Sequence, residues 1–272
     1  MTNRPIRVVV APDSFKGSLP APDAASAIAE GLTRGAPDTV AILRPMADGG
    51  EGTLDAVLGA AGHAATRGET EVEGAGGAPV RAGYGIVDRD GTPIAILECA
   101  QVVAITDAAG MAIPVAARTT TGLGRQLRAL LDRGVRRFMI GLGGSSTNDG
   151  GAGLLVALGL RLLDANGHDV EPTPGGLERL ARADASALDP RLALCELAIM
   201  SDVDNPLAGE RGATAIFGPQ KGVTPGRVAA IDATLARYAA IVESATGKRA
   251  SERAGAGAAG GLGFALMLAG GS

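Results

Sequence analysis

A predicted strand, a glycine-rich loop and a predicted helix follow one another in the middle of this chain, and no other element constrains the fold as strongly. Apolar residues 137–140 indicate the strand and residues 154–158 the helix. The loop between them, Gly141-Leu-Gly-Gly-Ser-Ser-Thr-Asn-Asp-Gly-Gly-Ala-Gly153, directs a helix N-terminus and backbone N–H groups at one point, which suits an anion. The alternative is an ordinary tight turn, but six glycines and four consecutive polar residues before Asp149 favour a phosphate site.

The amino-terminal part of the chain alternates predicted strands with predicted helices. Strands are expected over residues 7–11 and 40–43, and helices over residues 22–33 and 53–61. This order is typical of a parallel sheet that binds its ligands outside the carboxyl ends of the strands. The loops that follow the two strands therefore become candidate ligand-binding segments.

Beyond residue 69 the pattern changes to short alternating runs with glycines between them, which predict antiparallel strands. We expect these strands at 70–73, 80–84 and 93–98, and place a change of domain near 74–78. Three further elements are expected: a helix over 122–131, a buried strand over 192–200, and a long helix from Thr224 to Ser244 that begins with Thr224 as N-cap and Pro225 in its first position. The fold class predicted from these patterns is α/β.

Composition excludes several classes of function. Apolar residues make up 46% of the 272-residue chain, which is enough for a sizeable core, whereas a net charge of −4 and an aromatic content of 2% argue against nucleic-acid binding. No run of 18 apolar residues and no signal-peptide pattern occurs, so we expect a cytoplasmic protein without a membrane span. Cys99 and Cys195 are expected to be buried reduced thiols.

Polar side chains cluster after the first two predicted strands. Asp13, Ser14 and Lys16 follow the first strand and can bind a carboxylate or a phosphate. Asp48 and Glu51 follow the second strand, between glycines, where two acids can hold Mg²⁺ or one can act as a base. Both groups also have structural interpretations, as a capped turn and as negative charge at a helix N-terminus.

A second set of polar side chains follows the predicted strand that ends at Met200. Asp202, Asp204 and Asn205 occupy positions that suit a metal or a general base, although an Asx turn explains them as well. Lys221 lies on a turn before the long helix.

Three familiar signatures do not apply to this chain. A Walker A motif ends in Gly-Lys-Ser or Gly-Lys-Thr. Neither Lys16-Gly17-Ser18 nor the 141–153 loop has that order, so the motif is absent from the sequence. Residues 255–260 match the Gly-x-Gly-x-x-Gly pattern of a dinucleotide fingerprint, but no predicted strand precedes them. His63 and His168 have no neighbouring partners for a triad or a zinc site.

Taken together, six motifs resemble the bacterial glycerate kinase family, whose members phosphorylate D-glycerate with ATP. They occur in the family's order and cover essentially the whole chain: residues 11–18, 45–53, 141–153, 201–207, 217–222 and 255–263. Only the 141–146 segment also resembles the phosphate loop of galactokinases and homoserine kinases, and the other blocks do not fit that group.

The resemblance implies two α/β domains. A flavodoxin- or Rossmann-like domain would consist of residues 1–75 plus 253–272, and a mixed-sheet α/β domain, residues 76–252, would be inserted into it. Family members continue beyond the position of Ser272, so we expect this chain to lack the carboxyl-terminal part of the first domain. The alternative to an active kinase is then a non-catalytic fragment that at most binds a nucleotide or an organic acid.

The resemblance also implies a reaction and a set of site residues. ATP with Mg²⁺ would phosphorylate glycerate, with 2-phosphoglycerate favoured over 3-phosphoglycerate; we expect no nucleic-acid or membrane partner and leave a homodimer open. Lys16 would bind the glycerate carboxylate or the transferred phosphoryl group, Asp48 or Asp204 would accept the hydroxyl proton, and Asp149 or Asp202 would hold Mg²⁺. The remaining expected contacts to phosphate are Gly143, Gly144, Ser145, Ser146, Asn148 and Lys221, and those to substrate are Asp13, Ser14, Glu51 and Asn205.

Overall fold

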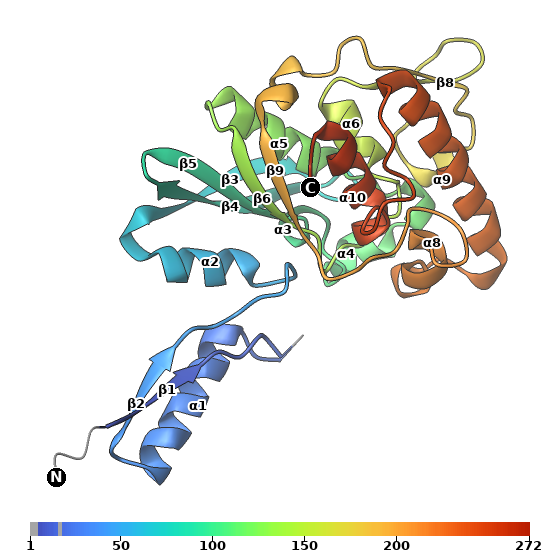
Figure 1. The fold of residues 1–272 in the computed structure, drawn as a ribbon. Helices are drawn as coiled ribbons and strands as arrows, with labels where there is room; N and C mark the ends of the chain where they lie inside the picture. The colour runs from blue at the N-terminus through green and yellow to red at the C-terminus, as the bar shows by residue number, and fades with distance from the viewer. Residues whose placement is uncertain (1–4, 16–17) are drawn as a thin grey trace.

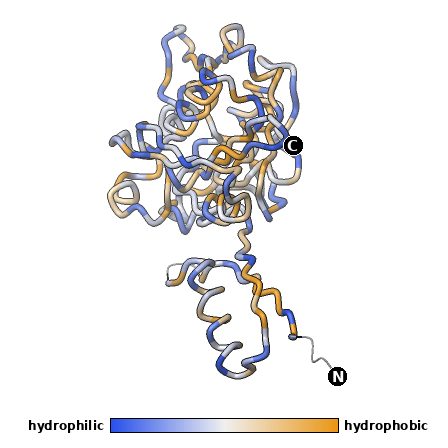
Figure 2. The backbone as a smooth tube through the Cα atoms, turned by 90° about the vertical axis from the view of Figure 1, so that its left-hand side faces the viewer, coloured by the Kyte–Doolittle hydropathy of each residue, from blue (hydrophilic) through white to orange (hydrophobic). Residues whose placement is uncertain are grey.

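The computed structural model describes residues 5–15 and 18–272 (Figure 1). A small amino-terminal unit contains β1 (Ile6–Val10), α1 (Ala21–Gly35) and β2 (Thr39–Leu43), and its two strands pair in parallel, as expected. Figures 1 and 2 show this unit set apart from the rest of the molecule and joined to it by the segment after β2. The apolar side chains of Ile6, Val9 and Val40 are exposed on its strands.

A five-stranded mixed sheet with the order β3-β4-β5-β6-β9 organises the remainder. β3 (Ala65–Glu73), β4 (Pro79–Arg89) and β5 (Thr92–Glu98) are antiparallel, whereas β6 (Arg137–Gly141) and β9 (Glu196–Met200) run parallel to β5. The strand expected over 192–200 begins only at Glu196, because Asp189 caps a 3-10 helix, η3 (Pro190–Leu194), that takes up its first part. The other predicted strands and helices are confirmed.

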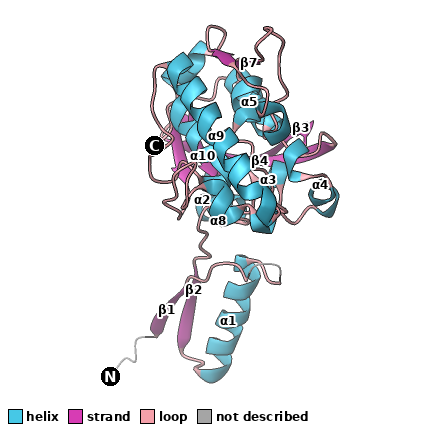
Figure 3. Ribbon diagram, turned by 90° about the vertical axis from the view of Figure 1, so that its right-hand side faces the viewer, coloured by secondary structure: helices cyan, strands magenta, loops and turns pink. Residues whose placement is uncertain are grey.

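Helices cover both faces of this sheet (Figure 3). α2 (Thr53–Ala61) packs Leu54 and Leu58 against the face of β4 at Gly85. Gln126 of α5 (Thr121–Asp132) donates to the carbonyls of Ala82 and Gly83 from the opposite face. The remaining helices are α3 (Ala100–Val103), α4 (Ala108–Ala112), α6 (Ala152–Ala157), α7 (Pro174–Leu177), α8 (Ala213–Phe217), α9 (Pro225–Thr246), α10 (Ala258–Ala269), η1 (Gly62–Ala64), η2 (Val115–Ala117) and η4 (Pro219–Lys221). β7 (Arg161–Leu163) pairs with β8 (Arg182–Asp184) in a separate antiparallel sheet, and α7 lies between them in sequence.

Two observations differ from the expected domain division. The boundary at residues 75 and 76 lies in the tight turn of the β3–β4 hairpin, whose strands pair from Ala65 opposite Val87 to Glu73 opposite Pro79. At the other end, α10 packs against α6, α8 and β9, and Gly271 forms a bridge with Leu197 of β9. Within the described residues, the last segment of the chain therefore belongs to the packing around the large sheet. The wider assignment of residues to two domains stays a prediction.

The described part of the chain contains no helix with the length and apolarity needed to cross a membrane. Both cysteines are free thiols; Cys99 is buried as expected, and Cys195 is only half-buried.

The loop after β2 meets the ends of β6 and β9 in a close backbone contact. The Gly143 N–H donates to the Gly49 carbonyl at 3.0 Å, and the Leu142 N–H donates to the Met200 carbonyl at 3.1 Å. A Cβ atom on Gly141 would lie 2.6 Å from the Gly49 oxygen, and one on Gly143 would overlap the Gly50 Cα. The glycines at these positions are required because two backbones approach each other with no room for a side chain.

Replacing Gly143 by alanine is expected to lower the free energy of unfolding by about 1–3 kcal/mol, the usual cost of overpacking. The matched control is Gly31→Ala in α1, where a Cβ meets nothing within 4 Å and alanine is the better helix former. Urea denaturation of both variants measures the difference. An unchanged midpoint for Gly143→Ala would contradict the close contact.

Candidate active site

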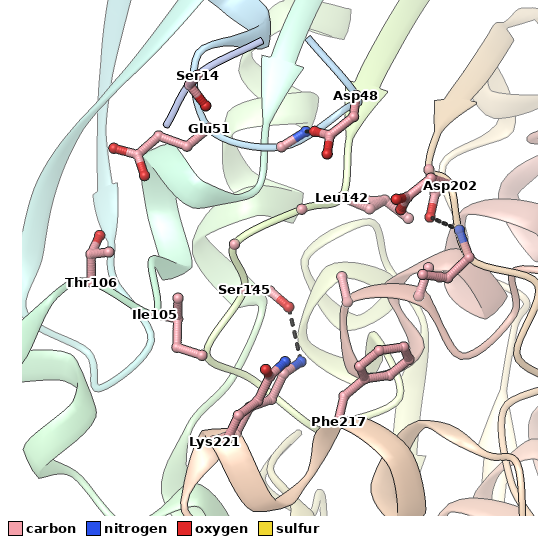
Figure 4. Close-up of a pocket in the computed structure, with 18 residues that line it drawn as sticks. Ser14, Asp48, Glu51, Ile105, Thr106, Leu142, Ser145, Asp202, Phe217 and Lys221 are labelled. Atoms are coloured by element: carbon pink, nitrogen blue, oxygen red, sulfur yellow. Dashed lines mark hydrogen bonds between the residues drawn. The ribbon is translucent and has the colours of Figure 1, made fainter. Parts of the chain in front are cut away.

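A cavity of about 310 Å³ opens where the ends of β6 and β9 meet the loop after β2 (Figure 4). One end of it is formed by the residues that follow β6, here called the glycine loop (141–153), and by the turn η4. The other end is formed by the acidic loop (45–52). The full lining is Ser14, Asp48, Gly50, Glu51, Ile105, Thr106, Leu142, Gly143, Gly144, Ser145, Ser201, Asp202, Val203, Phe217, Gln220, Lys221, Ala258 and Ala259.

Lys221 and Ser145 form the cationic end of the cavity. The Lys221 Nζ donates to the Ser145 Oγ at 2.9 Å and to the Thr147 carbonyl at 2.8 Å, and the whole side chain is 2% exposed. Burial lowers the pKa of Lys221 to about 8; the nearby Arg118 charge adds to this shift, while Cys99 and Asp149 oppose it. A buried ammonium group at a cavity wall, held by neutral oxygens, retains free capacity for an anion.

Three carboxylates line the opposite part of the cavity. Asp48 and Glu51 belong to the acidic loop, and Asp202 follows β9. In Figure 4 the three acids lie on one side of Ser145 and Lys221 lies on the other, with Glu51 beside Ser14. The Gly50 N–H donates to the Asp48 Oδ1 at 2.9 Å, which holds this side chain within its loop. The three acids come from two loops that are far apart in sequence, and all are exposed to solvent.

The structure brings together eight of the fifteen residues expected in the site, and these are Ser14, Asp48, Glu51, Gly143, Gly144, Ser145, Asp202 and Lys221. Lys16 lies outside the described residues. Six others do not line the cavity. Of these, Asp13 lies beside it and accepts the Ser14 N–H at 2.6 Å.

Asp149 has a structural role in place of the metal contact that the sequence suggested. Its side chain is 0% exposed, and its Oδ2 accepts from the Thr120 N–H and hydroxyl, each at 2.8 Å. The Gly153 N–H also donates to Oδ2, and the Gly151 N–H donates to Oδ1. The carboxylate therefore fastens the glycine loop to the start of α5 and α6, and it does not reach the cavity.

Four further residues expected in the site make structural contacts outside the cavity. Asp204 is exposed and forms an ion pair with Arg211 at 3.3 Å, and Asn205 donates to the Arg211 carbonyl at 2.8 Å. Ser146 donates its hydroxyl to the Val103 carbonyl, and Asn148 donates its amide to the Thr214 hydroxyl, both at 2.9 Å. Only the first part of the glycine loop, Gly143 to Ser145, therefore faces the cavity, and the residues from Ser146 to Asp149 are buried.

Sequence reasoning missed several residues of the site. Ile105 and Thr106 line the cavity from a segment with no recognisable motif. Ala259 lines it too, and its positive φ of 53° is unusual for a residue with a side chain. Buried Glu98, whose pKa is raised mainly by burial, accepts the Leu54 N–H at the start of α2 and so anchors the helix that follows the acidic loop. The only feature of the sequence that could have indicated Glu98 is its position at the end of an apolar strand.

Residues 8–272 match the glycerate kinase family. The chain belongs to this family. It is 43% identical to the glycerate kinase of Bacillus subtilis (strain 168), over 96% of this chain and 68% of that protein. It is 41% identical to the glycerate 2-kinase of Escherichia coli (strain K12), over 96% of this chain and 68% of that protein.

A crystal structure described as glycerate kinase 2 from Salmonella typhimurium LT2 has the same fold as this family member. The TM-score is 0.85 at 42% sequence identity, and the match covers 98% of this chain and 71% of that one. The α/β fold expected from the sequence is confirmed, as is the enzyme class, an ATP-dependent kinase, because the family consists of such transferases.

Asp149→Ala is expected to lower the free energy of unfolding by about 3–5 kcal/mol, the range for removing one partner from a buried charged set. The reason is that four donors lose their acceptor at once. Asp204→Ala is the control, because an exposed ion pair contributes about 0–1 kcal/mol. Denaturation is measured with Mg²⁺ and with a chelator; a loss that depends on Mg²⁺ would contradict the structural role.

Proposed function

We propose that this chain transfers the γ-phosphoryl group of ATP to a hydroxyl of D-glycerate and forms 2-phosphoglycerate. The observation that carries the proposal is the division of one cavity into a cationic end, with Lys221 and Ser145, and an acidic end, with Asp48, Glu51 and Asp202. Such a division suits a reaction between a phosphate donor and a hydroxyl acceptor, in which catalysis comes from positioning and charge neutralisation. Relatives named glycerate kinase and glycerate 2-kinase supply the choice of acceptor and of hydroxyl.

The phosphate groups of ATP bind at the cationic end in this proposal. The Ser145 hydroxyl and the Lys221 ammonium group face the cavity, and Gly144 brings the backbone close without a side chain. The Gly143 N–H donates to Gly49, so this group holds the acidic loop and leaves phosphate binding to its neighbours. The Gly144 and Ser145 N–H groups take part in none of the backbone hydrogen bonds found among the described residues and thus remain for the anion.

Glycerate binds at the acidic end, beside Ser14 and Glu51. Asp48 is the proposed acceptor for the proton of the attacking hydroxyl, because it lines the cavity and its carboxylate is oriented by the Gly50 N–H. In this proposal the glycerate hydroxyl lies between Asp48 and the phosphate-binding groups Ser145 and Lys221, as an in-line transfer requires.

The donor set fits a Mg²⁺ ion that enters with the nucleotide. The described residues contain no cluster of three metal-binding side chains, whereas Asp202 and Asp48 present carboxylates to the cavity. Mg²⁺ is commonly held by one or two carboxylates together with substrate phosphates. When bound by Asp202, the ion would neutralise charge on the phosphates, and Asp48 would keep its role as proton acceptor.

Asp48→Asn and Asp202→Asn are each expected to lower kcat/KM for glycerate phosphorylation by about 10²-fold or more, the usual contribution of a positioned acid or base. Asp204→Asn is the matched control, because this residue lies on the same loop as Asp202 but outside the cavity. A coupled ADP assay measures turnover, and calorimetry with ATP–Mg²⁺ measures binding. Unchanged turnover in both variants would overturn the assigned roles, and binding by the parent chain without turnover would identify the non-catalytic alternative.

ATP affinity is expected to fall as the pH rises through about 8, where Lys221 loses its proton. The effect on stability has the opposite sign: between about pH 8 and the ordinary lysine pKa of 10.5, the unfolded chain holds more protons, so the Lys221 contribution to unfolding free energy rises with pH. Lys221→Met should remove the Lys221 contribution to the pH dependence of both the ATP affinity and the unfolding free energy. Calorimetry and urea denaturation at pH 7 to 9.5 compare the two proteins, and identical pH profiles would contradict the buried, titrating lysine.

A further inference from the structure

Arg118 is a buried cation that none of the sequence motifs includes. It lies between η2 and α5 and is 2% exposed. Its Nε donates to the Ile113 carbonyl at 2.8 Å, and its Nη2 donates to the Met111 carbonyl at 2.9 Å. Its Nη1 lies 3.2 Å from the Met111 sulfur. All of the acceptors found for this guanidinium among the described residues are neutral.

Two more of its hydrogen bonds join the two elements that make the cationic end of the cavity. Nη1 donates to the Ser146 carbonyl of the glycine loop at 2.9 Å and to the Lys221 carbonyl of η4 at 2.8 Å. These acceptors are 75 positions apart in sequence and reach the same nitrogen. A single planar group thereby sets the distance between the loop that carries Ser145 and the turn that carries Lys221.

The charges around Lys221 leave this end of the cavity short of negative groups. The groups that act on Lys221 are Arg118, Asp149 and Cys99. Burial raises the pKa of the Cys99 thiol to about 12, so it stays neutral. The Asp149 carboxylate is saturated by its four donors. Two buried cations thus face one buried acid that is already engaged.

A buried charge without a counter-ion is costly. The backbone carbonyls that Arg118 contacts offset part of this cost, but they carry no negative charge. An anion in the cavity would supply the missing negative charge beside Lys221. That anion would then balance the positive charges of both Lys221 and Arg118.

We propose that Arg118 is a positioning residue for phosphate binding, which holds Ser145 and Lys221 in the arrangement that receives the anion and keeps positive charge behind it. The proposal rests on the proposed function in that the anion is the phosphate of ATP. Arg118 itself lies behind the lining and does not touch the nucleotide.

The test uses the whole chain and three variants. Arg118→Met removes the charge and the hydrogen bonds. Arg118→Lys keeps the charge but not the planar guanidinium group with its several N–H donors, here called the fork. Arg136→Met is the control. Arg136 is half-buried, donates to the Leu131 and Val135 carbonyls, and lies outside the cavity lining. Calorimetry with ATP–Mg²⁺ at pH 8, in two buffers of different ionisation heat, gives the Kd and the number of protons taken up.

The parent chain should take up as much as about half a proton, because Lys221 is half-protonated near pH 8 and an anion favours its charged form. Arg118→Met should raise the Kd at least tenfold, about 1.4 kcal/mol, and reduce the proton uptake, since the pKa of Lys221 rises when the Arg118 charge is removed and more of the lysine is then charged before binding. Arg118→Lys should keep the uptake and recover only part of the affinity. Arg136→Met should behave as the parent. Parent-like Kd and uptake in folded Arg118→Met would overturn the proposal.

A second readout does not depend on ATP. The ¹⁵N resonance of the Lys221 ammonium group reports its pKa in the ligand-free protein, and this pKa should rise in Arg118→Met and stay low in Arg118→Lys. An unchanged value in Arg118→Met would contradict the coupling of the two cations. If Arg118→Met does not fold, Arg118→Lys decides, because a parent-like Kd there would show that the fork is not needed. A parent chain that does not bind ATP contradicts the proposed function, and the resonance still tests the role of Arg118.

Discussion

The hydrogen bonds to the buried Asp149 carboxylate are the interaction on which the site depends. A glycine-rich loop has high conformational entropy when unfolded, and six glycines would leave the 141–153 segment without a defined shape unless another group imposed one. Asp149 does so by accepting N–H groups from Gly151 and Gly153 and both donors of Thr120. One side chain thereby sets the curvature of the loop and attaches it to the start of α5.

The segment before α5 supplies both of the supports behind this loop. Thr120 binds Asp149 near the carboxyl end of the glycine loop, and Arg118, two residues earlier, binds the Ser146 carbonyl near its middle. The residues between these anchors are buried, whereas Gly143 to Ser145 face the cavity. The loop therefore has a rigid rear side and a small binding side, so that fewer of its polar residues can contact a ligand than its composition suggests.

This division explains which parts of the site could be predicted from the sequence. Strand ends followed by glycines and acids indicated Asp48, Glu51, Asp202 and the start of the glycine loop, all of which line the cavity, because the direction of a parallel strand determines where its following loop lies. The same reasoning assigned Asp149 to a metal, since a carboxylate in a loop looks the same in sequence whether it faces a cavity or the core. Burial distinguishes the two, and burial depends on the distant Thr120.

Prediction of the fold has the same limit, because the sequence indicates local structure but not the contacts between distant residues. Alternation and helical periodicity predicted β1 to β6, β9 and the helices α1, α2, α5, α6 and α9, since both depend on local spacing, but they did not predict β7, β8 or the remaining helices. The expected domain boundary near residue 75 came from a change in pattern, and the structure has a hairpin turn there, because a glycine-rich turn and a linker have the same composition. Likewise, the sequence does not indicate the packing of α10, whose partners are α6, α8 and β9.

The two ends of the cavity come from parts of the chain that are joined by backbone hydrogen bonds and close backbone contacts. The acidic loop follows β2 of the small amino-terminal unit, while Lys221 and Ser145 belong to the packing around the large sheet. Their separation is set by the hydrogen bond from Gly143 to Gly49 and by the absence of side chains at that contact. Backbone contacts of this kind cannot adjust by a change of rotamer, so a Cβ there must move one end of the cavity relative to the other. The glycines between the two ends are therefore as much a part of the site as its charged groups, because they fix the distance across which a phosphoryl group would pass.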